Sequence, residues 1–345
     1  MKMLILQIGN KINNKKKIVI RPTTSKENGG GHFFRSLNLA EIFNKNHDVT
    51  LIVDELTPLQ KKKIRFIDIK MKEINQILTY DSKVDICILD GYSFSNSETS
   101  FWKENSNFIV SFDDLCKEYK FADLLISFGN KKKISNGRQI ITDIKYAPVS
   151  KDCFIKSKKI KIKKSIKNIM INFGLIDSKG LALEILKIIS KNYNLFDKIN
   201  FFIIIGSMHK YQQGINVILK SKNIRYKLLI ETDKMYEYLS KSDLVIGAAG
   251  VSLLERVSMG IPSITIPTSD NQMNQLKVIE TRQGTKSIKF PFIEKKFVNF
   301  LMEIAENYNK RKLMSTKAKQ IIKENSTKLL SEKIINLYNQ SFNHK

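Results

Sequence analysis

The stretch "KIVIRPTTSKENGGGHFFRSLNLAEIF" (residues 17–43) decides the fold class of this chain. Its first five residues, 17–21, are mostly apolar and predict a buried strand. A polar loop with three consecutive glycines follows, and apolar residues at helical spacing over 32–45 then predict an amphipathic helix. A strand that leads into a helix in this way is typical of a βαβ unit, in which helices connect parallel strands.

The same alternation continues along most of the chain. Besides residues 17–21, the first half predicts strands at 48–53, 84–90 and 107–112, and helices at 32–45, 71–80 and 96–105. The second half predicts strands at 168–174, 199–206, 226–230, 243–248 and 263–267, and helices at 177–193, 233–241, 251–259 and 271–283. The last fifty residues predict helices only. We therefore expect an α/β protein with two parallel sheets.

A loss of pattern near the middle of the chain suggests where the two domains separate. Residues 151–167, "KDCFIKSKKIKIKKSIK", are rich in Lys and predict a linker. The chain then divides into an N-terminal Rossmann-like domain (1–150) and a C-terminal domain with terminal helices (168–345), which suits a length of 345 residues. The first fifteen residues fit either an extra strand or an ordered extension.

The composition excludes several functional classes. The net charge is +26, but only eight of the 59 basic residues are Arg, which indicates a coding bias toward Lys more than a nucleic-acid-binding surface. We expect no nucleic-acid partner, although a basic surface would attract an anionic substrate. No apolar run approaches the ~18–20 residues of a membrane span, and no signal peptide is recognisable. Scattered Cys87, Cys116 and Cys153 favour a reducing compartment over a zinc site, so we expect a cytoplasmic protein. We also expect it to be a monomer.

The glycine loop is the first candidate site. Gly29, Gly30 and Gly31 allow the backbone to approach a ligand closely and to adopt positive φ. The helix that begins near Gly31 offers free N–H groups and a dipole that suit an anion. His32 lies in its first turn, where a neutral imidazole could accept a proton, and Arg35 shares its helix face. The alternative is a plain tight turn with His32 as a partly buried polar residue.

Two familiar glycine motifs do not fit this spacing. The chain has no GxxxxGK[ST] sequence, so the loop is not a P-loop. It also has no GxGxxG at a first βα turn with an acidic residue at the next strand end, so we do not expect a bound dinucleotide.

Polar residues also follow other predicted strands, where ligands of open parallel sheets bind. In the first half these are Asp90 and Tyr92 in "ILDGYSF", and Asp113 and Asp114 in "SFDDLC". The paired carboxylates could bind a metal, or one of them could cap a helix. In "INFGLIDS" a strand ends at Gly174, and Asp177 stands where the N-cap of a helix is expected.

The stretch "GAAGVSLLERVSMGIPSITIPTSDNQMNQ" (247–275) is the most specific in the second half. Gly247 and Gly250 bracket a turn from strand to helix, and Glu255 follows after one helical turn. A carboxylate can bind both hydroxyls of a ribose, while a helix start can bind phosphate. The alternative for Glu255 is an acidic residue on a surface helix. A second loop supplies further polar side chains: Asp270, Asn271 and Gln272.

Together, these residues resemble a family of UDP-sugar hydrolases in pseudaminic acid biosynthesis, which remove UDP from UDP-2,4-diacetamido-2,4,6-trideoxy-β-L-altropyranose. The family opens with a strand, an Arg, a loop containing Ser, and G-x-G-H-x-x-R. The counterparts here are Arg21, Ser25, Gly29, Gly31, His32 and Arg35, and later "LDGYS", "SFDD", "NFGLID" and "GAAGVSLLE…DNQ". The resemblance covers about residues 17–285.

The resemblance implies a GT-B fold, in which two Rossmann-like domains face a central cleft, similar to the N-acetylglucosaminyltransferase of peptidoglycan lipid synthesis. It implies that His32 is the catalytic base and that no cofactor or metal takes part. The substrate would be a UDP-sugar, hydrolysed with inversion at the anomeric carbon. The residues expected to bind it are Arg21, Gly29, Gly31, Arg35, Asp90, Tyr92, Asp113, Asp114, Gly174, Asp177, Gly250, Val251, Ser252, Glu255, Asp270, Asn271 and Gln272.

Two alternatives to hydrolysis remain. A glycosyltransferase of the same fold would use a sugar or lipid hydroxyl in place of water, and a sugar-nucleotide-binding protein would catalyse nothing. The sequence also departs from the family pattern near the expected sugar site. Thr23 stands where the family often has Asp, Gly91 where it has His, and Leu175 where it has a second Gly. The sugar can therefore differ even where the chemistry is retained.

Overall fold

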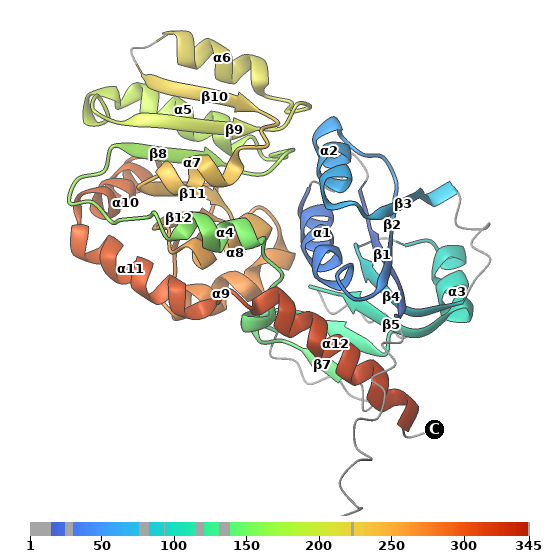
Figure 1. The fold of residues 1–345 in the computed structure, drawn as a ribbon. Helices are drawn as coiled ribbons and strands as arrows, with labels where there is room; N and C mark the ends of the chain where they lie inside the picture. Colours follow the sequence, from blue (N-terminus) through green and yellow to red (C-terminus); the bar gives the residue numbers. More distant parts are fainter. Residues whose placement is uncertain are drawn as a thin grey trace, which may run out of the picture.

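The N-terminal half of the computed structural model contains one parallel sheet, whose strand order is β3-β2-β1-β4-β5-β6-β7 (Figure 1). The structure describes residues 15–24, 30–75, 83–92, 94–114, 121–130, 139–221 and 224–343. The strands are β1 (Lys17–Pro22), β2 (Asp48–Val53), β3 (Lys70–Glu73), β4 (Val84–Asp90), β5 (Ser106–Phe112), β6 (Leu124–Ile126) and β7 (Gln139–Ile141). The helices are α1 (Gly31–Phe43), α2 (Pro58–Ile67), α3 (Asn96–Asn105), η2 (Ile144–Tyr146) and α4 (Lys151–Ser157).

The C-terminal half contains a second parallel sheet, in the order β10-β9-β8-β11-β12-β13. Its strands are β8 (Asn168–Asn172), β9 (Asn200–Ile205), β10 (Arg225–Ile230), β11 (Leu244–Ala248), β12 (Ser263–Ile266) and β13 (Lys286–Ser287). Its helices are α5 (Leu181–Lys191), η3 (Tyr193–Leu195), α6 (Gln212–Ser221), α7 (Met235–Lys241), α8 (Val251–Met259), η4 (Asp270–Gln272), α9 (Met273–Thr281), α10 (Glu294–Glu306), α11 (Tyr308–Ile321) and α12 (Ser326–Asn343).

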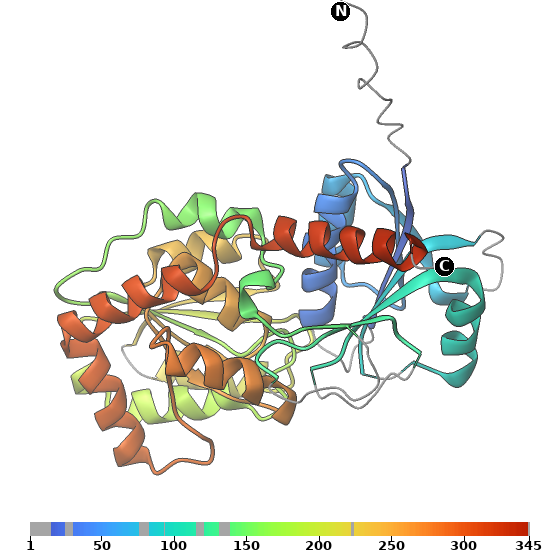
Figure 2. The ribbon, with the colours of Figure 1, turned by 90° about the horizontal axis from the view of Figure 1, so that it is seen from below.

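The central strands are buried on both faces, because helices cover the two sides of each sheet (Figures 1 and 2). In β4, all residues but one are buried, and β2 and β11 are similar. Such strands appear in a sequence as continuous apolar runs, which is why they could be predicted. The predictions for 48–53, 84–90, 96–105 and 251–259 match β2, β4, α3 and α8 residue for residue.

The helix predicted at 71–80 is wrong at its start, because β3 occupies Lys70–Glu73. Its sequence, KMKE, has no buried residue and therefore no apolar alternation to mark it as a strand. Parallel pairing with residues Thr50–Val53 of β2 determines its conformation. Residues 76–80 lie outside the described part of the chain, as do the first fourteen residues, Ser25 and Gly29.

The expected domain limits differ from the packing at two places. Residues 151–157 of the expected linker form α4, whose Cys153 and Phe154 are buried, and α4 packs on α7 and α8. The last helix, α12, returns to the N-terminal domain and lies against α1 (Figure 2). The hydroxyl of Tyr338 on α12 donates to Asp85 Oδ1 at 2.7 Å, and its ring lies 6.0 Å from that of Phe108. The chain thus crosses between the domains twice.

Candidate active site

The two sheets have the same kind of topology, so the loops that can bind a ligand follow corresponding strands in each domain. The first strand of each domain, β1 or β8, lies inside its sheet, and the chain builds outward on both sides of it. A crevice therefore opens between the loops after β1 and β4, and another between the loops after β8 and β11. The first crevice contributes His32 and Asp90, and the second contributes the turn at Gly250.

His32 and Asp90 form a buried pair in the first crevice. His32 Nδ1 lies 2.7 Å from Asp90 Oδ1, and the Asp90 side chain has no exposed surface. Burial alone would raise the pKa of Asp90, but interactions with Arg35 and His32 outweigh it and lower the pKa well below its usual range. An ionised carboxylate can only accept, so Nδ1 carries the hydrogen of this bond. In the neutral ring, Nε2 is then the nitrogen that can accept a proton.

Arg35 fixes Asp90 in place. Its Nε donates to Asp90 Oδ2 at 2.9 Å and its Nη2 to Oδ1 at 2.5 Å, in the bidentate geometry that Arg and carboxylates favour. Its Nη1 donates to Asp114 Oδ2 at 3.2 Å, and Ser36 Oγ donates to Asp90 Oδ2 at 3.1 Å. The guanidinium of Arg35 is turned to Asp90 and Asp114, so this geometry does not support its expected contact with the substrate. It positions the carboxylates instead.

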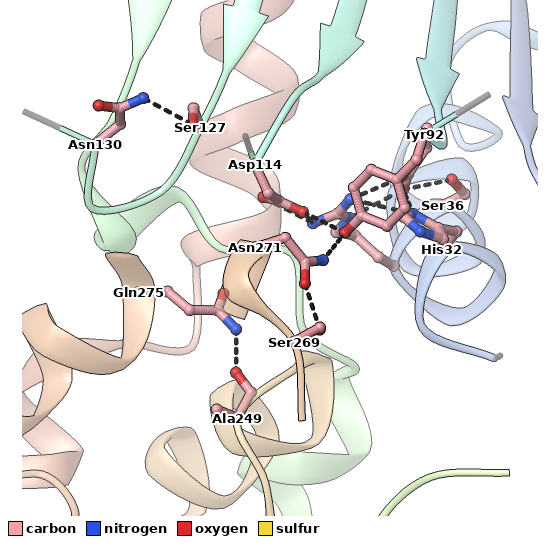
Figure 3. Close-up of polar contacts among 12 residues, drawn as sticks. His32, Ser36, Tyr92, Asp114, Ser127, Asn130, Ala249, Ser269, Asn271 and Gln275 are labelled. Carbon is pink, nitrogen blue, oxygen red and sulfur yellow. Dashed lines mark hydrogen bonds and ion pairs between the residues drawn. The ribbon is translucent and has the colours of Figure 1, made fainter. Parts of the chain in front are cut away.

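Tyr92 connects this cluster to the C-terminal domain. Its ring stands edge-on to His32, with 4.5 Å between the ring centroids. Its hydroxyl donates to Asp114 Oδ2 at 3.1 Å and accepts a hydrogen bond from Asn271 Nδ2 on η4. Figure 3 shows Tyr92 between Asp114 and Asn271, with His32 beside it. Five residues predicted from four motifs therefore meet at one place: His32, Asp90, Tyr92, Asp114 and Asn271.

Arg21 was expected to bind substrate, and the structure gives it another role. Its Nη2 donates to Asp54 Oδ1 at 2.6 Å, and its Nε to Glu98 Oε1 at 2.7 Å. Burial by itself would lower the pKa of Arg21, but the two carboxylates raise it. The side chain is 3% exposed, so Arg21 joins the ends of β1, β2 and α3 and does not face an open site.

The first residues of α1 and α8 meet across the two domains. A Cβ atom on Gly31 would lie 3.6 Å from Val251 Cγ2. The N-caps are Gly30 and Gly250, which have no side chain to accept from the first N–H groups, and neither helix has an acidic residue in its first turn. Two positive helix ends with available N–H groups therefore lie together. This arrangement suits a ligand with several negative charges.

The loop between β12 and α9 completes this region. The side-chain amide of Gln272 lies 3.6 Å from the position of a Cβ on Gly250 and hydrogen-bonds to Thr268. Gln275 donates to the carbonyl oxygen of Ala249, as Figure 3 shows. Asp270 is exposed beside them. The predicted residues Gly250, Val251, Ser252, Asp270, Asn271 and Gln272 thus belong to one region.

Asp177 caps a helix, as predicted. Its two oxygens accept from the N–H groups of Leu181 and Ala182 at 2.9 and 2.8 Å, although the N-cap residue of α5 is Gly180. His209 Nε2 lies 3.4 Å from Asp177 Oδ2. Asp177 is 4% exposed, so its expected contact with substrate has no support in this geometry. Nearby Gly174 has φ +88°, a conformation that favours glycine.

Glu255 differs most from its expected role. It is 7% exposed, and its Oε1 accepts a hydrogen bond of 2.7 Å from the hydroxyl of Tyr236 on α7. Burial raises the pKa of Glu255. Glu255 is therefore not an acidic residue on a surface helix, and its contact with a ribose stays a prediction. The sequence could not show this, because α4, whose buried Cys153 packs in the same interior, was predicted as a linker.

Asp113 and Asp114 were open to two interpretations, metal binding or helix capping. Asp114 accepts from Arg35 and Tyr92 at the edge of the cluster. Asp113 is buried, and its N–H donates to the carbonyl of Ile126 on β6. Within the described ranges, no three His, Cys, Asp or Glu side chains are grouped to hold a metal ion. Asp114 therefore takes part in the cluster through Arg35 and Tyr92.

Thr23 and Gly91, which both depart from the family pattern, lie next to each other in the structure. A Cβ atom on Gly91 would lie 2.3 Å from Thr23 Cγ2 and 2.6 Å from Thr23 Oγ1, which is closer than atoms can pack. The side chain of Thr23 therefore occupies the space that any other residue at position 91 would need. Both lie beside Asp90, since Thr23 N–H donates to the Asp90 carbonyl at 2.9 Å.

A cavity of about 210 Å³ is lined by residues of both domains. Leu175 lines it and also packs against Gly30, where a Cβ would lie 2.8 Å from Leu175 Cδ1. The remaining lining comes from Thr24, Glu55, Leu56, Thr57, Pro58, Gln60, Ile176, Gly206, Ser207, Met208 and Glu231. Most of these were missed from the sequence, although several directly follow strands and so lie at the carboxyl edge of a sheet.

Comparisons with known proteins agree with this architecture. Residues 180–334 match the glycosyltransferase family 28 C-terminal domain. The chain is 26% identical over 277 residues to MJ1062, an uncharacterized protein of Methanocaldococcus jannaschii, which covers 74% of this chain and 56% of that protein. It is 27% identical over 111 residues, 32% of each chain, to the spore coat polysaccharide biosynthesis protein SpsG of Bacillus subtilis. The chain thus spans about half of the first relative and a third of the second.

Solved structures share the whole architecture. S. aureus MnaA, solved with UDP, superposes with a TM-score of 0.69 at 14% identity, over 95% of this chain and 97% of that one. Acinetobacter baumannii MurG gives a TM-score of 0.64 at 15% identity, over 93% and 99%. The fold is GT-B. This confirms the predicted fold class of two parallel-sheet domains. Among the described residues, no helix is long and apolar enough to cross a membrane.

Proposed function

We propose that this protein hydrolyses a UDP-linked amino sugar, with a 2,4-diacetamido-trideoxy sugar of nonulosonic acid biosynthesis as the first candidate. One observation carries the proposal. The N-termini of α1 and α8, with no acidic residue in their first turns, meet beside the buried His32–Asp90 pair. A site for several negative charges and a candidate proton acceptor are thereby brought together.

The two helix ends hold the diphosphate in this proposal. The N–H groups that follow Gly30 and Gly250 donate to its oxygens, and both dipoles favour its charge. The likeness to MnaA, which was solved with UDP, supports the choice of nucleotide. The cavity beside Leu175 gives the ligand further room between the domains. The high positive net charge of the chain favours the arrival of such an anion.

His32 acts as the base. Its Nε2 takes a proton from a water molecule as the water oxygen forms a bond to the anomeric carbon. The bond from that carbon to the diphosphate oxygen breaks, and its electron pair leaves with UDP. Asp90 accepts from Nδ1 and stabilises the imidazolium that forms. General-base help of this kind contributes about 10²–10⁴-fold in rate.

The leaving group needs no strong acid, because a diphosphate is stable as an anion and the helix ends stabilise its charge further. Water that attacks from the face opposite the diphosphate inverts the anomeric carbon. The free sugar is therefore released first as the opposite anomer, before mutarotation mixes the two forms.

A glycosyltransferase is the second candidate, because residues 180–334 match the glycosyltransferase family 28 C-terminal domain. In that case, His32 would take the proton from an acceptor hydroxyl in place of water. The same anion site and the same base serve both reactions, so the nucleophile alone distinguishes them.

An assay without acceptor or lipid separates the two functions. The purified protein is incubated with UDP-linked and CMP-linked sugars, and release of free nucleotide is followed through many turnovers. Early proton NMR spectra should show the inverted anomer of one UDP-sugar. Release that stays stoichiometric until a hydroxyl acceptor or lipid extract is added would replace the hydrolase with the transferase. Absence of turnover under both conditions would reject enzymatic function on these substrates.

A further inference from the structure

Arg256 on α8 is a buried cation directly beneath the proposed diphosphate site. It is 1% exposed, and its guanidinium lies under the turn between β11 and α8. A Cβ on Gly247 would lie 3.0 Å from Arg256 Nη1, so glycine at that position makes room for it. Nη2 donates to the carbonyl of Ala248 at 2.8 Å and to Thr265 Oγ1 at 3.3 Å.

The carboxyl of Glu255 attracts this charge but makes no ion pair with it. Within the part of the chain that the structure describes, Arg256 forms no ion pair, and its Nε has no hydrogen-bond partner. The neighbouring carboxyl, Glu255, hydrogen-bonds to Tyr236 instead. Burial lowers the pKa of Arg256 to about 9, which leaves the side chain charged at neutral pH. A buried charge without an ion-pair partner is costly to the stability of a fold.

Ser252 links this charge to the surface of the site. Arg256 Nη1 donates to Ser252 Oγ at 3.1 Å, one turn back toward the start of α8. Because the Ser252 oxygen accepts from Arg256, its hydroxyl hydrogen is free to donate elsewhere, and none of the described residues accepts it. Ser252 is half-buried in the first turn of α8, beside the free N–H groups that follow Gly250.

We propose that Arg256 is a positioning residue for the phosphates of the ligand, an inference that rests on the proposed function. It adds a positive charge behind the α8 N-terminus and directs the Ser252 hydroxyl toward the anion. In a medium of intermediate dielectric, a charge several ångströms away changes the affinity for an anion by roughly tenfold. The effect depends on the charge of the ligand.

A series of ligands with increasing charge tests this. Calorimetry measures the dissociation constants of uridine, UMP and UDP for the wild type and for Arg256→Met. We expect Arg256→Met to weaken UDP binding about 10- to 30-fold, UMP less, and uridine by less than about twofold. If Arg256 has only a structural role, Arg256→Met should weaken the binding of all three ligands equally, and that result would overturn the proposal. Arg256→Lys should restore part of the preference for UDP.

Arg311→Met is the matched control. Arg311 is also 1% exposed, and it donates to the carbonyls of Ile304, Ala305, Lys163 and Lys164, none of which belongs to the proposed site. It should lower thermal stability without changing the relative affinities for uridine, UMP and UDP. The same change in relative affinities in both variants would count against a local effect of Arg256.

Ser252→Ala tests whether the Ser252 hydroxyl binds the anion. It also tests the proposal if Arg256→Met does not fold. It should weaken UDP binding about 3- to 10-fold and leave uridine unchanged. In the Arg256→Met background it should add little, because the two residues act together. Unchanged UDP affinity in Ser252→Ala overturns the proposal. If the wild type itself does not prefer UDP to uridine, the proposed function fails, whereas a preference that survives in Arg256→Met removes only this inference.

Discussion

The starts of α1 and α8 share a glycine N-cap but differ in the charged side chains that pack behind them. Each begins after a glycine N-cap, has no acidic residue in its first turn, and meets the other at Gly31 and Val251. Behind α1, one guanidinium is shared by two carboxylates, Asp90 and Asp114. Behind α8, the guanidinium of Arg256 has only a carbonyl and two hydroxyls as acceptors.

This difference separates two tasks within one cleft. The carboxylate beside His32 fixes the tautomer of the imidazole and stabilises a proton on it, which suits proton transfer. The guanidinium beneath Ser252, which has no ion-pair partner among the described residues, adds to the positive end of a helix, and this suits the binding of an anion. Mutations behind α1 should therefore affect turnover, while mutations behind α8 should affect nucleotide affinity.

The largest effect is expected for Asp90→Asn. Turnover should fall about 10³–10⁴-fold, because an amide no longer fixes the tautomer of His32 or stabilises the imidazolium. The unfolding free energy should fall by about 3 kcal/mol, because the buried Arg35 loses its bidentate partner. Steady-state kinetics and urea unfolding measure the two effects. Turnover within tenfold of the wild type would contradict the role given to Asp90.

The pH dependence of stability provides a check on the same variant. The pKa of Asp90 in the folded protein lies below its ordinary value of ~3.9, so the ionised form stabilises the fold. This contribution is complete above about pH 4 and is lost as the pH falls toward the lower folded value. The difference in unfolding free energy between the wild type and Asp90→Asn should therefore be constant near pH 7 and shrink below about pH 4.

His32→Ala should reduce turnover about 10²–10⁴-fold, the usual contribution of a general base. The dissociation constant of UDP should change less than about threefold, because the backbone N–H groups of α1 and α8, and not the His32 side chain, hold the diphosphate in this proposal. His47→Ala serves as a control, since His47 lies just after α1 and contacts the backbone of Lys16. A His32 variant that turns over within a few-fold of the wild type would leave His32 a structural role only.

A smaller effect, on stability, is expected at the contact of Thr23 and Gly91. Gly91→Ala places a Cβ 2.3 Å from Thr23 Cγ2, and overpacking of this kind costs about 1–3 kcal/mol. Thr23→Ala in the same chain should recover part of the loss, because it removes both clashing side-chain atoms. Urea unfolding of the two single variants and the double variant gives the coupling. Strictly additive losses would show that the two residues do not share this space.

Sequence patterns predicted what depends on neighbours along the chain. β2 and β4 are buried on both faces and appear as apolar runs, while α1 and α8 follow glycine turns, so their limits were recognisable. The exposed edge strand β3 depends on pairing with β2, which no local pattern shows. The cluster at His32 was predicted as a set of residues, because each one follows a strand at the same sheet edge.

What the side chains do within that set could not be predicted from the sequence. Arg21 and Arg35 were expected at the ligand, but each has two carboxylates that only the folded chain brings near. A charged residue in a loop motif looks the same in a sequence whether it faces a ligand or another residue. Arg256 was missed for the converse reason. Its importance comes from having no carboxylate partner, and that is a property of the packing around it.

Glu255→Gln should have the smallest effect and sharpens the contrast between the two helix starts most directly. Glu255 is one residue before Arg256 on α8, yet its carboxyl is turned to Tyr236. The amide keeps the shape and can still accept from the Tyr236 hydroxyl, so the unfolding free energy should fall by no more than about 1 kcal/mol. The affinities for uridine, UMP and UDP should all stay within about twofold of the wild type.

The matched variant Tyr236→Phe removes the same hydrogen bond from the other side, and calorimetry with the three ligands applies to both variants. If the contact is purely internal, each variant loses a similar amount of stability and the double variant loses little more. A ribose contact predicts a different pattern. The affinities for uridine, UMP and UDP would all fall by about tenfold or more in Glu255→Gln, whereas 2′,3′-dideoxy-UDP would bind the wild type and Glu255→Gln equally. That result would show that Glu255 binds the ribose. Helix α8 would then carry two residues of opposite charge that act on the ligand, Glu255 on the ribose and Arg256 on the phosphates.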